Sequence, residues 1–400
     1  MGSMITLGLG KLEVDWGKNN YFRNHSKLFQ IDDIKKISYY YADDIEEFEE
    51  GYSKQLKHVK PRLELLGYTF DTLEEIFDSH IAKVEEYEQA PDIVFSRLVE
   101  IIQAINISNF DFDDENEPYD YDFGEFVKKY LFKQEGFIES FSEDELLSCN
   151  LATFLESIDV YFLLRILAEN DDNLELNLEW RYSDVVDGGW VTLEDIQQGL
   201  EDSDKYLIVT EGSSDSFIIN KTIKLLFPEI ADFFYFVDME EHYPFTGTGN
   251  LYRFSQGLSS INIQNNVVII YDNDVAGIEK FVQTQKLKLP KNMKVMHLPK
   301  VEDFKKFNTV GPQGNSLEDI NSKAVAIELF LDLSYQEERA PSIRWTSYSK
   351  DLDSYQGELE YKDTYVTRFK KIKTFDDGYN NQKLKLLISE IIRVCVSVHI

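Results

Sequence analysis

The sequence is poor in cysteine, glycine and proline, and each shortage excludes a class of protein. Only two cysteines occur, Cys149 and Cys395, and they form no CxxC pair. We therefore expect neither a disulfide framework nor a structural zinc site, and we expect a cytoplasmic protein. With 20 glycines and 9 prolines the chain cannot be fibrous or linker-like. No apolar run reaches the length of about 18 residues that a membrane span needs, and the N-terminus lacks a signal peptide.

Positive charge is also scarce, with 41 basic against 73 acidic residues and a formal net charge of −32. Such a surface opposes binding modes in which a basic face clamps nucleic acid. Any nucleic acid must therefore be contacted locally, through metal ions, or with the help of a basic partner.

Hydrophobic residues, in contrast, make up 43% of the chain and aromatic residues 14%. This supply is sufficient for buried cores and excludes wholesale disorder. At about 150 residues per domain, a chain of 400 residues predicts two or three domains.

The first half of the chain predicts a mainly α-helical domain over residues 1–200, with a regulatory or partner-binding role. Residues 4–45 have the alternation of strands and turns, and apolar residues then recur with helical spacing from about Asp44 to Glu169. An acidic, aromatic segment at residues 110–122 interrupts this pattern. It is either a solvated loop, or a nucleic-acid mimic or docking site for a basic partner.

After residue 204, strand and helix patterns alternate regularly. Strands are expected at 205–210, 233–237, 266–271 and 293–298, and helices at 216–226, 251–258 and 276–285. This order predicts an α/β domain over residues 204–335, with a parallel sheet and helices on both faces. Residues 336–400 are expected to extend it with a hairpin (342–348 and 355–361), a basic helix (365–373) and a final helix (384–398).

Acidic residues follow two of the predicted strands. Glu211 ends the first strand, and Asp272 and Asp274 end the third. Ligands of open α/β sheets bind at the carboxyl ends of the strands, and clustered carboxylates suit hard cations such as Mg²⁺. Asp215 falls at the start of the next helix, where it either faces the same cleft or caps the helix. Two ions held there could stabilise both oxygens of a phosphodiester displacement.

These residues resemble the TOPRIM domain of topoisomerases, primases and several nucleases. The resemblance covers about residues 204–335 and rests on Glu211, on Gly247-Thr248-Gly249-Asn250, and on the Asp272-x-Asp274 pair. The Glu211-Gly212-Ser213-Ser214-Asp215 segment looks most like OLD-family and defence-associated TOPRIM nucleases. Residues 311–328, 341–345 and 355–357 are similar to bacterial HEPN/Toprim-associated proteins, suspected anti-phage or toxin effectors.

The resemblance implies a role for each matching residue. Glu211 would bind metal or act as general acid or base, and Asp215, Asp272 and Asp274 would be ligands of two Mg²⁺ or Mn²⁺ ions. A further acid often follows the fourth strand, and OLD nucleases use a lysine near the scissile phosphate. The predicted set includes Asp319 and Lys300, and the alternatives are Glu302, Asp303 and Lys323. Gly247 and Gly249 either contact phosphate or make a tight turn.

Two further motifs indicate no extra site. The Gly8-Leu9-Gly10-Lys11 segment has Ile5 and Leu12 where a P-loop needs glycine and Ser or Thr. No ATP site is expected, which departs from OLD proteins and suggests that any ATPase or sensor is a separate partner. Arg393 and His399 have the spacing of HEPN ribonucleases, but their apolar, β-branched surroundings favour a buried terminal segment.

The densest basic group is either the exposed face of an amphipathic helix or a strip that contacts phosphates beside the acidic site. It consists of Lys362, Arg368, Lys370, Lys371 and Lys373.

Taken together, the sequence predicts a divalent-metal-dependent endonuclease that cleaves DNA or RNA in bacterial anti-phage defence or as a toxin, and it leaves oligomer formation open. The alternatives are a topoisomerase- or primase-like TOPRIM enzyme, and a non-enzymatic acidic regulator that binds a partner and retains a degenerate metal site.

Overall fold

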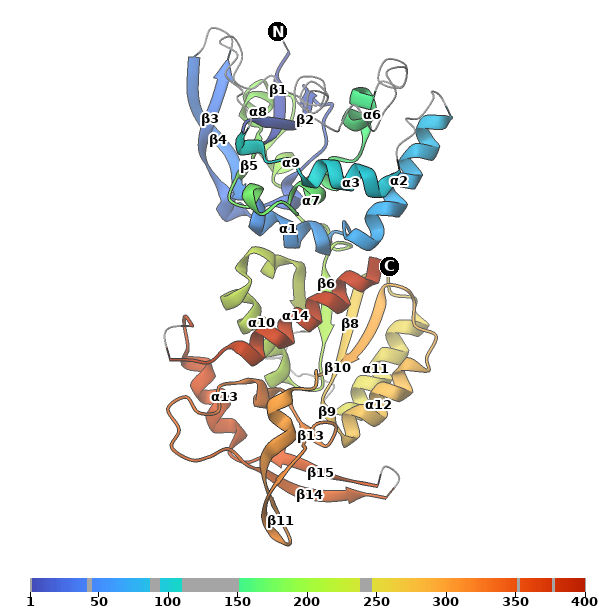
Figure 1. Ribbon diagram of the computed structural model, residues 1–400, viewed down its shortest axis with the longest axis vertical. Coiled ribbons are helices and arrows are strands. Elements are labelled where there is room, and N and C mark those ends of the chain that lie inside the picture. The colour runs from blue at the N-terminus through green and yellow to red at the C-terminus, as the bar shows by residue number, and fades with distance from the viewer. Residues whose placement is uncertain are drawn as a thin grey trace. The chain divides into compact units, whose positions relative to one another are not determined.

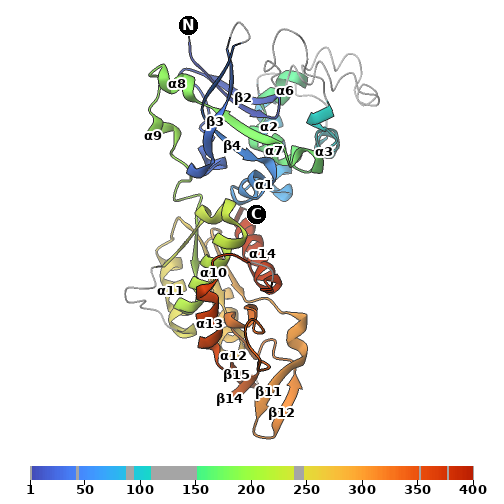
Figure 2. The same ribbon diagram turned by 90° about the vertical axis from the view of Figure 1, so that its left-hand side faces the viewer.

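A computed structural model describes residues 2–41, 45–86, 94–109, 151–237, 247–350, 353–375 and 378–399. The chain divides into two compact units, residues 1–201 and residues 202–399. Figure 1 shows their secondary structure, and Figure 2 shows it from a perpendicular direction.

The N-terminal unit is built on an antiparallel sheet of five strands in the order β2-β1-β5-β4-β3. The strands are β1 (Met4–Leu9), β2 (Leu12–Lys18), β3 (Ile34–Tyr41), β4 (Ile45–Gln55) and β5 (Asn177–Arg181). The strand β5 inserts between β1 and β4, although it follows β4 by more than a hundred residues. Residues that are distant in the sequence therefore complete this sheet.

Helices cover the sheet and share its core. They are α1 (Leu56–Leu65), α2 (Phe70–Glu85), α3 (Phe95–Gln103), α6 (Leu151–Ser157), α7 (Val160–Leu167), α8 (Ser183–Asp187) and α9 (Leu193–Ile196). All eight residues of α7 are buried, and one continuous core joins the seven hydrophobic ones to sheet residues such as Leu7 and Trp180. Burial of this apolar surface is the main force that stabilises the unit.

The prediction of a mainly helical N-terminal domain is not confirmed, because this unit is a mixed α/β structure. Several predicted helices between residues 56 and 167 are present, but residues 45–55 form the longest strand of the sheet. Apolar spacing in a short segment does not separate helix from strand, and β4 depends on pairing with the distant β5. The acidic segment at residues 110–122 lies outside the described residues.

The C-terminal unit contains the predicted parallel sheet. Its strands are β6 (Tyr206–Val209), β7 (Phe234–Phe236), β8 (Asn266–Tyr271) and β10 (Met293–His297), and all neighbours in the order β10-β8-β6-β7 are parallel. All six residues of β8 are buried, as expected for a strand covered on both faces. The α/β prediction is confirmed at this level.

Helices lie on both faces of this sheet (Figure 1). On one side are α10 (Ser213–Leu226) and α14 (Gln382–Val396), and on the other are α11 (Thr248–Ser260) and α12 (Val275–Gln285). From β6 the chain moves to one neighbour, β7, and it then crosses to the other neighbour, β8. The carboxyl ends of β6 and β8 therefore flank a topological switch point, where ligands bind in open α/β sheets.

A second sheet of four strands has the order β12-β11-β14-β15. Its strands are β11 (Phe307–Gly311), β12 (Gly314–Glu318), β14 (Ile343–Ser349) and β15 (Ser354–Leu359). The β14–β15 hairpin was predicted, and the β11–β12 hairpin was not. Between them, β13 (Ala324–Val325) pairs with β9 (Asn273–Asp274), and a 3-10 helix spans Ile327–Phe330. The basic helix α13 (Lys362–Lys371) follows.

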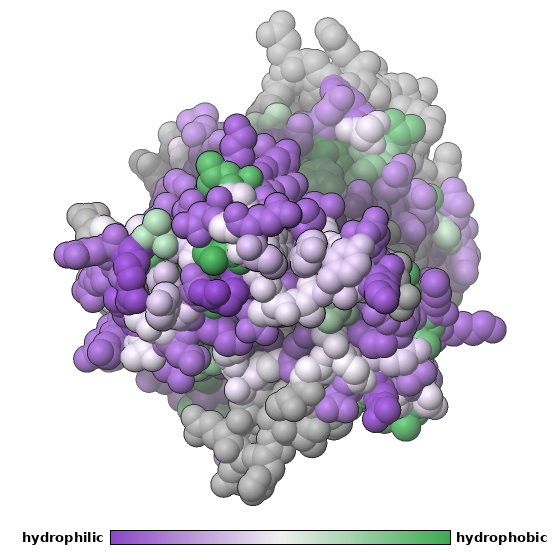
Figure 3. Space-filling model, turned by 90° about the horizontal axis from the view of Figure 1, so that it is seen from below, coloured by the Kyte–Doolittle hydropathy of each residue, from purple (hydrophilic) through white to green (hydrophobic). Residues whose placement is uncertain are grey.

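The face seen in Figure 3 is mainly hydrophilic, and its hydrophobic residues are scattered. Leu317 on β12 is an exposed hydrophobic residue. Scattered residues of this kind are normal on a protein surface. Among the described helices, none has both the length and the apolar character that crossing a membrane requires.

Candidate functional site

The ends of β6 and β8 bring two predicted acids together. The two strands are parallel neighbours, with Val209 opposite Ile269, and Glu211 and Asp272 follow them. The backbone N–H of Asp272 donates a hydrogen bond of 2.9 Å to Glu211 Oε1. The backbone N–H of Gly247 donates to the carbonyl oxygen of Glu211 at 3.0 Å. Three loops that are distant in the sequence thus meet at this edge of the sheet.

Gly247 takes a positive φ of 87° and lies directly before α11. This left-handed backbone explains the glycine, because other residues rarely adopt it. Gly247 is thus the N-cap of the helix and Gly249 lies in its first turn, and contact of either glycine with phosphate stays a prediction.

Asp215 caps the helix that follows β6. Its Oδ2 accepts a hydrogen bond of 2.9 Å from the backbone N–H of Gly212, and its Oδ1 accepts one of 3.3 Å from Ser214 Oγ. It lies in the first turn of α10, beside unpaired backbone N–H groups that favour a negative charge. Capping and ligand binding do not exclude each other here, since a carboxylate has several lone pairs.

Asp274 caps the next helix and is held from the second sheet. Its Oδ1 accepts a hydrogen bond of 2.7 Å from the backbone N–H of Gly277, and its Oδ2 accepts one from Gln356 Nε2. The Oε1 of Gln356 accepts in turn from the backbone N–H of Val275 at 3.0 Å. Gln356 on β15 therefore fixes both the carboxylate and the start of α12.

Gly277 allows α12 to approach the end of β8. A Cβ atom at this position would lie 2.2 Å from the carbonyl oxygen of Asp272 and 3.1 Å from its nitrogen. The distance of 2.2 Å to a backbone oxygen is far below van der Waals contact, so only glycine fits. The helix thus packs directly on the backbone of a site residue.

Sequence reasoning missed Glu328. It lies in the 3-10 helix Ile327–Phe330, it is 7% exposed, and its negative charge raises the pKa of both Asp215 and Asp272. The signal was a single acid within the buried apolar run from Ala324 to Leu331, a position where an unpaired charge is costly. Gln356 was missed as well, because only the tertiary structure brings β15 to Asp274.

Burial and mutual repulsion raise the pKa of these carboxyls. Burial raises the pKa of Glu211 to about 8, with further contributions from Asp274 and Asp215. Burial and the charge of Glu328 raise the pKa of Asp215 to about 7. The pKa of Asp272 lies well above its ordinary value, because burial and the charges of Asp215, Glu211, Asp274 and Glu328 all disfavour its ionised form. Such a group needs protons or cations to balance it.

A nearby lysine partly supplies that balance. The exposed Lys362, at the start of α13, lowers the pKa of Asp215 and of Glu328 by its positive charge. The four acids Glu211, Asp215, Asp272 and Asp274 remain partly accessible to solvent, so a small ligand can reach them. We call these four acids together with Glu328 the carboxylate group.

The carboxylate group fits a hard divalent cation by the chemistry of its donors. Among the described residues, however, no three acidic, histidine or cysteine side chains already converge with the geometry of a metal site. Both capping aspartates direct an oxygen at backbone N–H groups. Between Asp272 and Asp274, the fully buried amide of Asn273 has no hydrogen-bond partner. A buried amide without a partner is costly, and it marks this strand end as unsatisfied.

A family model described as HEPN/Toprim N-terminal domain 1 matches residues 1–204, just over half of the 400-residue chain. The chain belongs to this family. The predicted resemblance to HEPN/Toprim-associated proteins is confirmed at that level. No curated protein and no solved structure matches the chain. The carboxylate group follows the matched residues, so the family match does not itself assign a role to these acids.

In this HEPN/Toprim-associated protein, Asp319, the predicted fifth metal ligand, makes none of the contacts described above for the carboxylate group. Asp319 is exposed and orders a turn, since its Oδ1 accepts hydrogen bonds of 2.9 Å from the backbone and side-chain nitrogens of Asn321. Glu302 is paired with Lys305 at 2.8 Å, and Asp303 is exposed. The metal roles of these acids stay predictions, and Glu328 is the acid whose charge acts on Asp215 and Asp272.

The predicted lysines differ in their surroundings. Lys300 is exposed in the segment after β10, two residues beyond Leu298, whose N–H donates to the carbonyl oxygen of Tyr271. Lys323 is partly buried, and its backbone carbonyl accepts a hydrogen bond from Gly357. Both segments run beside the strand end that carries Asp272, but a catalytic role for either lysine stays a prediction.

The five basic residues of the predicted strip have three different surroundings. Lys362 acts on the carboxylate group, and Lys370 lies over the ring of Phe217 with its Nζ 5.4 Å from the centroid. Arg368 forms an ion pair of 3.1 Å with Glu337 and lines a cavity together with Lys371 and Lys373. Nucleic-acid binding by these residues stays a prediction.

Arg393 and His399 have separate structural contacts within the HEPN/Toprim-associated chain. Arg393 pairs with Glu390 at 2.7 Å, and His399 Nε2 lies 2.7 Å from the hydroxyl of Tyr206 on the first strand of the parallel sheet. Cys395 between them is buried, but Arg393 and His399 are both exposed, so the prediction of a buried segment is wrong for these two side chains.

Proposed function

We propose that this HEPN/Toprim-associated chain is a divalent-metal-dependent nuclease that cleaves phosphodiester bonds of DNA or RNA. The observation that carries the proposal is the carboxylate group at the switch point between β6 and β8. Acids from two strand ends, two helix starts and a 3-10 helix act on one another there. The TOPRIM resemblance of the residues that supply four of these acids supports the same chemistry.

Glu211, Asp215, Asp272, Asp274 and Glu328 would hold one or two Mg²⁺ or Mn²⁺ ions. A bound divalent ion would supply a nucleophilic hydroxide and stabilise charge on the phosphate oxygens. The protein's own contributions are the orientation of Glu211 by the Asp272 amide, and the positioning of Asp274 by Gln356. Glu211 would act as a metal ligand or as a general acid or base.

Lys362 provides the positive charge nearest to the carboxylate group among the residues of the predicted strip. It is exposed and acts on both Asp215 and Glu328. We infer that it contacts a phosphate of the substrate beside the scissile bond. With a net charge of −32, the protein surface as a whole repels a nucleic acid. A single lysine beside a metal site would attract the nucleic-acid strand locally in spite of this repulsion.

The cellular role that we propose is an effector of anti-phage defence or a toxin in the cytoplasm. Membership in the HEPN/Toprim family supports it, together with the resemblance to defence-associated TOPRIM nucleases. We expect a separate ATPase or sensor protein as partner, because Ile5 and Leu12 replace the residues that a P-loop needs.

A cleavage assay tests this proposal directly. The purified chain is incubated with supercoiled plasmid, single-stranded DNA and total RNA, each with Mg²⁺, Mn²⁺ or EDTA. Glu211→Gln is run beside it, and Asp319→Asn serves as a control on an exposed acid. Metal-dependent cleavage that is lost in Glu211→Gln supports the nuclease, and the substrate cleaved first identifies its class.

Calorimetry with Mn²⁺ on the same proteins separates the remaining outcomes. Metal binding without cleavage indicates a missing activating partner. The absence of both metal binding and cleavage would refute the metal site. Relaxed plasmid whose strands are intact in the product favours the topoisomerase alternative instead, because a topoisomerase rejoins the strand that it cleaves.

A further inference from the structure

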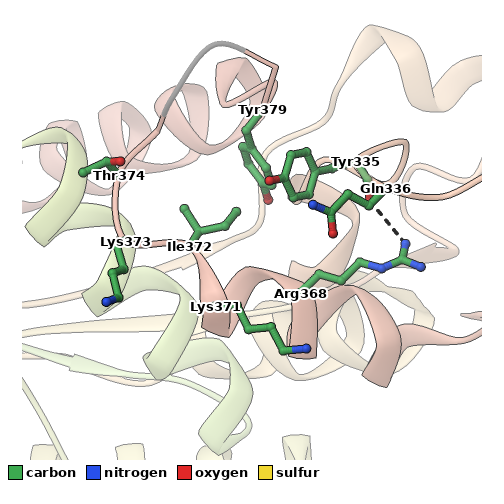
Figure 4. A pocket seen from close by; sticks show the side chains of 8 residues that line it. All are labelled: Tyr335, Gln336, Arg368, Lys371, Ile372, Lys373, Thr374 and Tyr379. Carbon is green, nitrogen blue, oxygen red and sulfur yellow. Dashed lines mark hydrogen bonds between the residues drawn. The ribbon is translucent and has the colours of Figure 1, made fainter.

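A cavity of about 500 Å³ opens beside the C-terminal half of α13 (Figure 4). Its walls come from the segment that carries Tyr335 and Gln336, from Arg368 and Lys371 on α13, and from the chain after the helix, which contributes Lys373 and Tyr379. This volume lies within the range of small-ligand sites, about 300–1,000 Å³. It is large enough for one nucleotide.

The charge of this cavity is opposite to the charge of the chain. Among its described lining residues are three cations, Arg368, Lys371 and Lys373, and no carboxylate. Glu337 neutralises one of them, since it pairs with Arg368 at 3.1 Å. Two exposed lysines therefore remain to attract an anion in a protein whose net charge is −32.

A lysine from another helix offsets the negative partial charge at the C-terminal end of α13. Carbonyl groups at a helix C-terminus carry partial negative charge, which would repel phosphate. Lys221 on α10 offsets that charge, because its Nζ donates hydrogen bonds of 2.8 Å to the carbonyl oxygens of both Phe369 and Lys370. Burial lowers the pKa of Lys221. Lys371 is thus left to face the cavity beside a covered helix end.

Two tyrosines form an aromatic wall. The rings of Tyr335 and Tyr379 lie edge to face with centroids 5.1 Å apart at 63°, next to each other in Figure 4, and the Tyr379 ring also packs against Phe375 with centroids 5.4 Å apart. The Tyr379 hydroxyl accepts a hydrogen bond of 3.1 Å from the backbone N–H of Asp332, and the Tyr335 carbonyl accepts one of 3.3 Å from Arg368. Both residues are therefore held in place and partly accessible. Aromatic faces of this kind stack on nucleobases.

We propose that this cavity binds a nucleoside phosphate, with the base against Tyr335 and Tyr379 and the phosphate on Lys371 and Lys373. A planar base and a phosphate are the chemistry that an aromatic wall facing lysines recognises. The nucleotide is either free or one unit of a nucleic-acid strand. The site is distinct from the carboxylate group, and the proposal does not depend on nuclease activity.

Binding is measured by calorimetry on the full chain in EDTA, so that neither divalent metals nor cleavage contribute. The probes are adenosine 5′-monophosphate, adenosine, inorganic phosphate and a short single-stranded oligodeoxynucleotide. We expect the monophosphate to bind more tightly than adenosine or phosphate alone. Lys371→Glu and Lys373→Glu should each weaken binding about tenfold or more, because each reverses a charge that contacts phosphate.

Lys385→Glu is the matched control, since this lysine is exposed on α14 and does not line the cavity. It should leave binding unchanged, and thermal melting verifies that all three variants are folded. Gln336→Ala changes the lining of the cavity without changing its charge and without removing an aromatic ring.

The outcomes distinguish the sources of the nucleotide. Binding of the oligodeoxynucleotide alone, lost in both cavity variants, assigns the site to a strand. Binding of the monophosphate, lost in the same variants, assigns it to a free nucleotide. The proposal is refuted if no probe binds, or if Lys371→Glu and Lys373→Glu bind as tightly as Lys385→Glu. Loss of cleavage in Glu211→Gln has no bearing on these results.

Discussion

The backbone N–H of Asp272 donates a hydrogen bond of 2.9 Å to Glu211 Oε1, and this contact joins the ends of two neighbouring parallel strands across 61 positions of sequence. The backbone N–H of Asp272 orients Glu211, so the Asp272 side chain stays available for a ligand. The same strand end carries a buried, unpartnered Asn273 amide and is contacted closely by Gly277.

Glu211→Gln should abolish metal-dependent cleavage while the protein remains folded. The amide keeps the shape of the side chain and can still accept the hydrogen bond from Asp272, but it loses the charge and the proton exchange. We expect at least about a hundredfold loss of cleavage, the usual weight of a positioned acid or base. Asp272→Asn should behave alike. Circular dichroism checks the fold, and full activity in either variant would contradict the site.

Glu328→Gln should weaken Mn²⁺ binding, whereas Asp319→Asn should not. Glu328 acts on both Asp215 and Asp272, so its removal takes away a carboxylate from the set that would hold the ion. We expect a loss of affinity of about tenfold or more in calorimetry. Asp319 is exposed on its turn and serves as the control. The reverse order would identify Asp319 as the ligand that the family resemblance implies.

Gly277→Ala should damage the site through the backbone. The new Cβ would lie 2.2 Å from the carbonyl oxygen of Asp272, so α12 or the strand end must move. Such overpacking costs about 2 kcal/mol, and melting should fall by several degrees. Cleavage should fall with it, since Asp272 is displaced.

Gly257→Ala is the matched control for Gly277→Ala, because its Cβ would meet no atom within 4 Å and its position in α11 is helical. This change should raise stability slightly, by about 0.5–1 kcal/mol. Equal effects of the two changes would show that the contact between Gly277 and Asp272 does not matter.

His25 should make the N-terminal unit sensitive to acid. It is buried, its Nε2 lies 2.8 Å from Asp15 Oδ2, and its Nδ1 lies 3.4 Å from the Tyr161 hydroxyl. Burial lowers the pKa of His25, and it outweighs the opposing effect of Asp15; Arg23 lowers it further, and Asp159 raises it. The folded state therefore keeps the ring neutral, while the unfolded state takes up a proton below its ordinary pKa of about 6.5.

Stability from His25 is thus present above pH about 6.5 and is lost as the pH falls below it. His25→Gln removes the titration, so the difference in unfolding free energy between wild type and variant should shrink by up to about 1.4 kcal/mol per pH unit between pH 6.5 and 5. Urea unfolding across this range measures it. A difference that is constant with pH would exclude His25 as the acid-sensitive group.

Much of the C-terminal unit was predictable because its signals are local. The strand predicted at 266–271 is β8 at Asn266–Tyr271, and the helix predicted at 276–285 is α12 at Val275–Gln285. Buried apolar runs, helical spacing and turn residues lie within each element, so no distant partner is needed to recognise them. The N-terminal sheet was less predictable, since β5 pairs with β1 and β4 across long stretches of chain.

That acids follow two strands of a parallel sheet could be predicted from the sequence, because strand patterns and residue types are local properties of the chain. Which other side chains lie beside these acids depends on the tertiary structure. Glu328 had only a weak local signal, Gln356 had none, and Lys362 was predicted only as part of a basic strip; long-range packing brings these residues to Asp215 and Asp274. The cavity between Tyr335 and Lys371 has the same origin, since its walls meet only after the chain folds back on α13. Local sequence patterns specify individual helices and strands. Whether several carboxylates lie close together, or whether distant segments line one cavity, depends on the free energy of the whole fold.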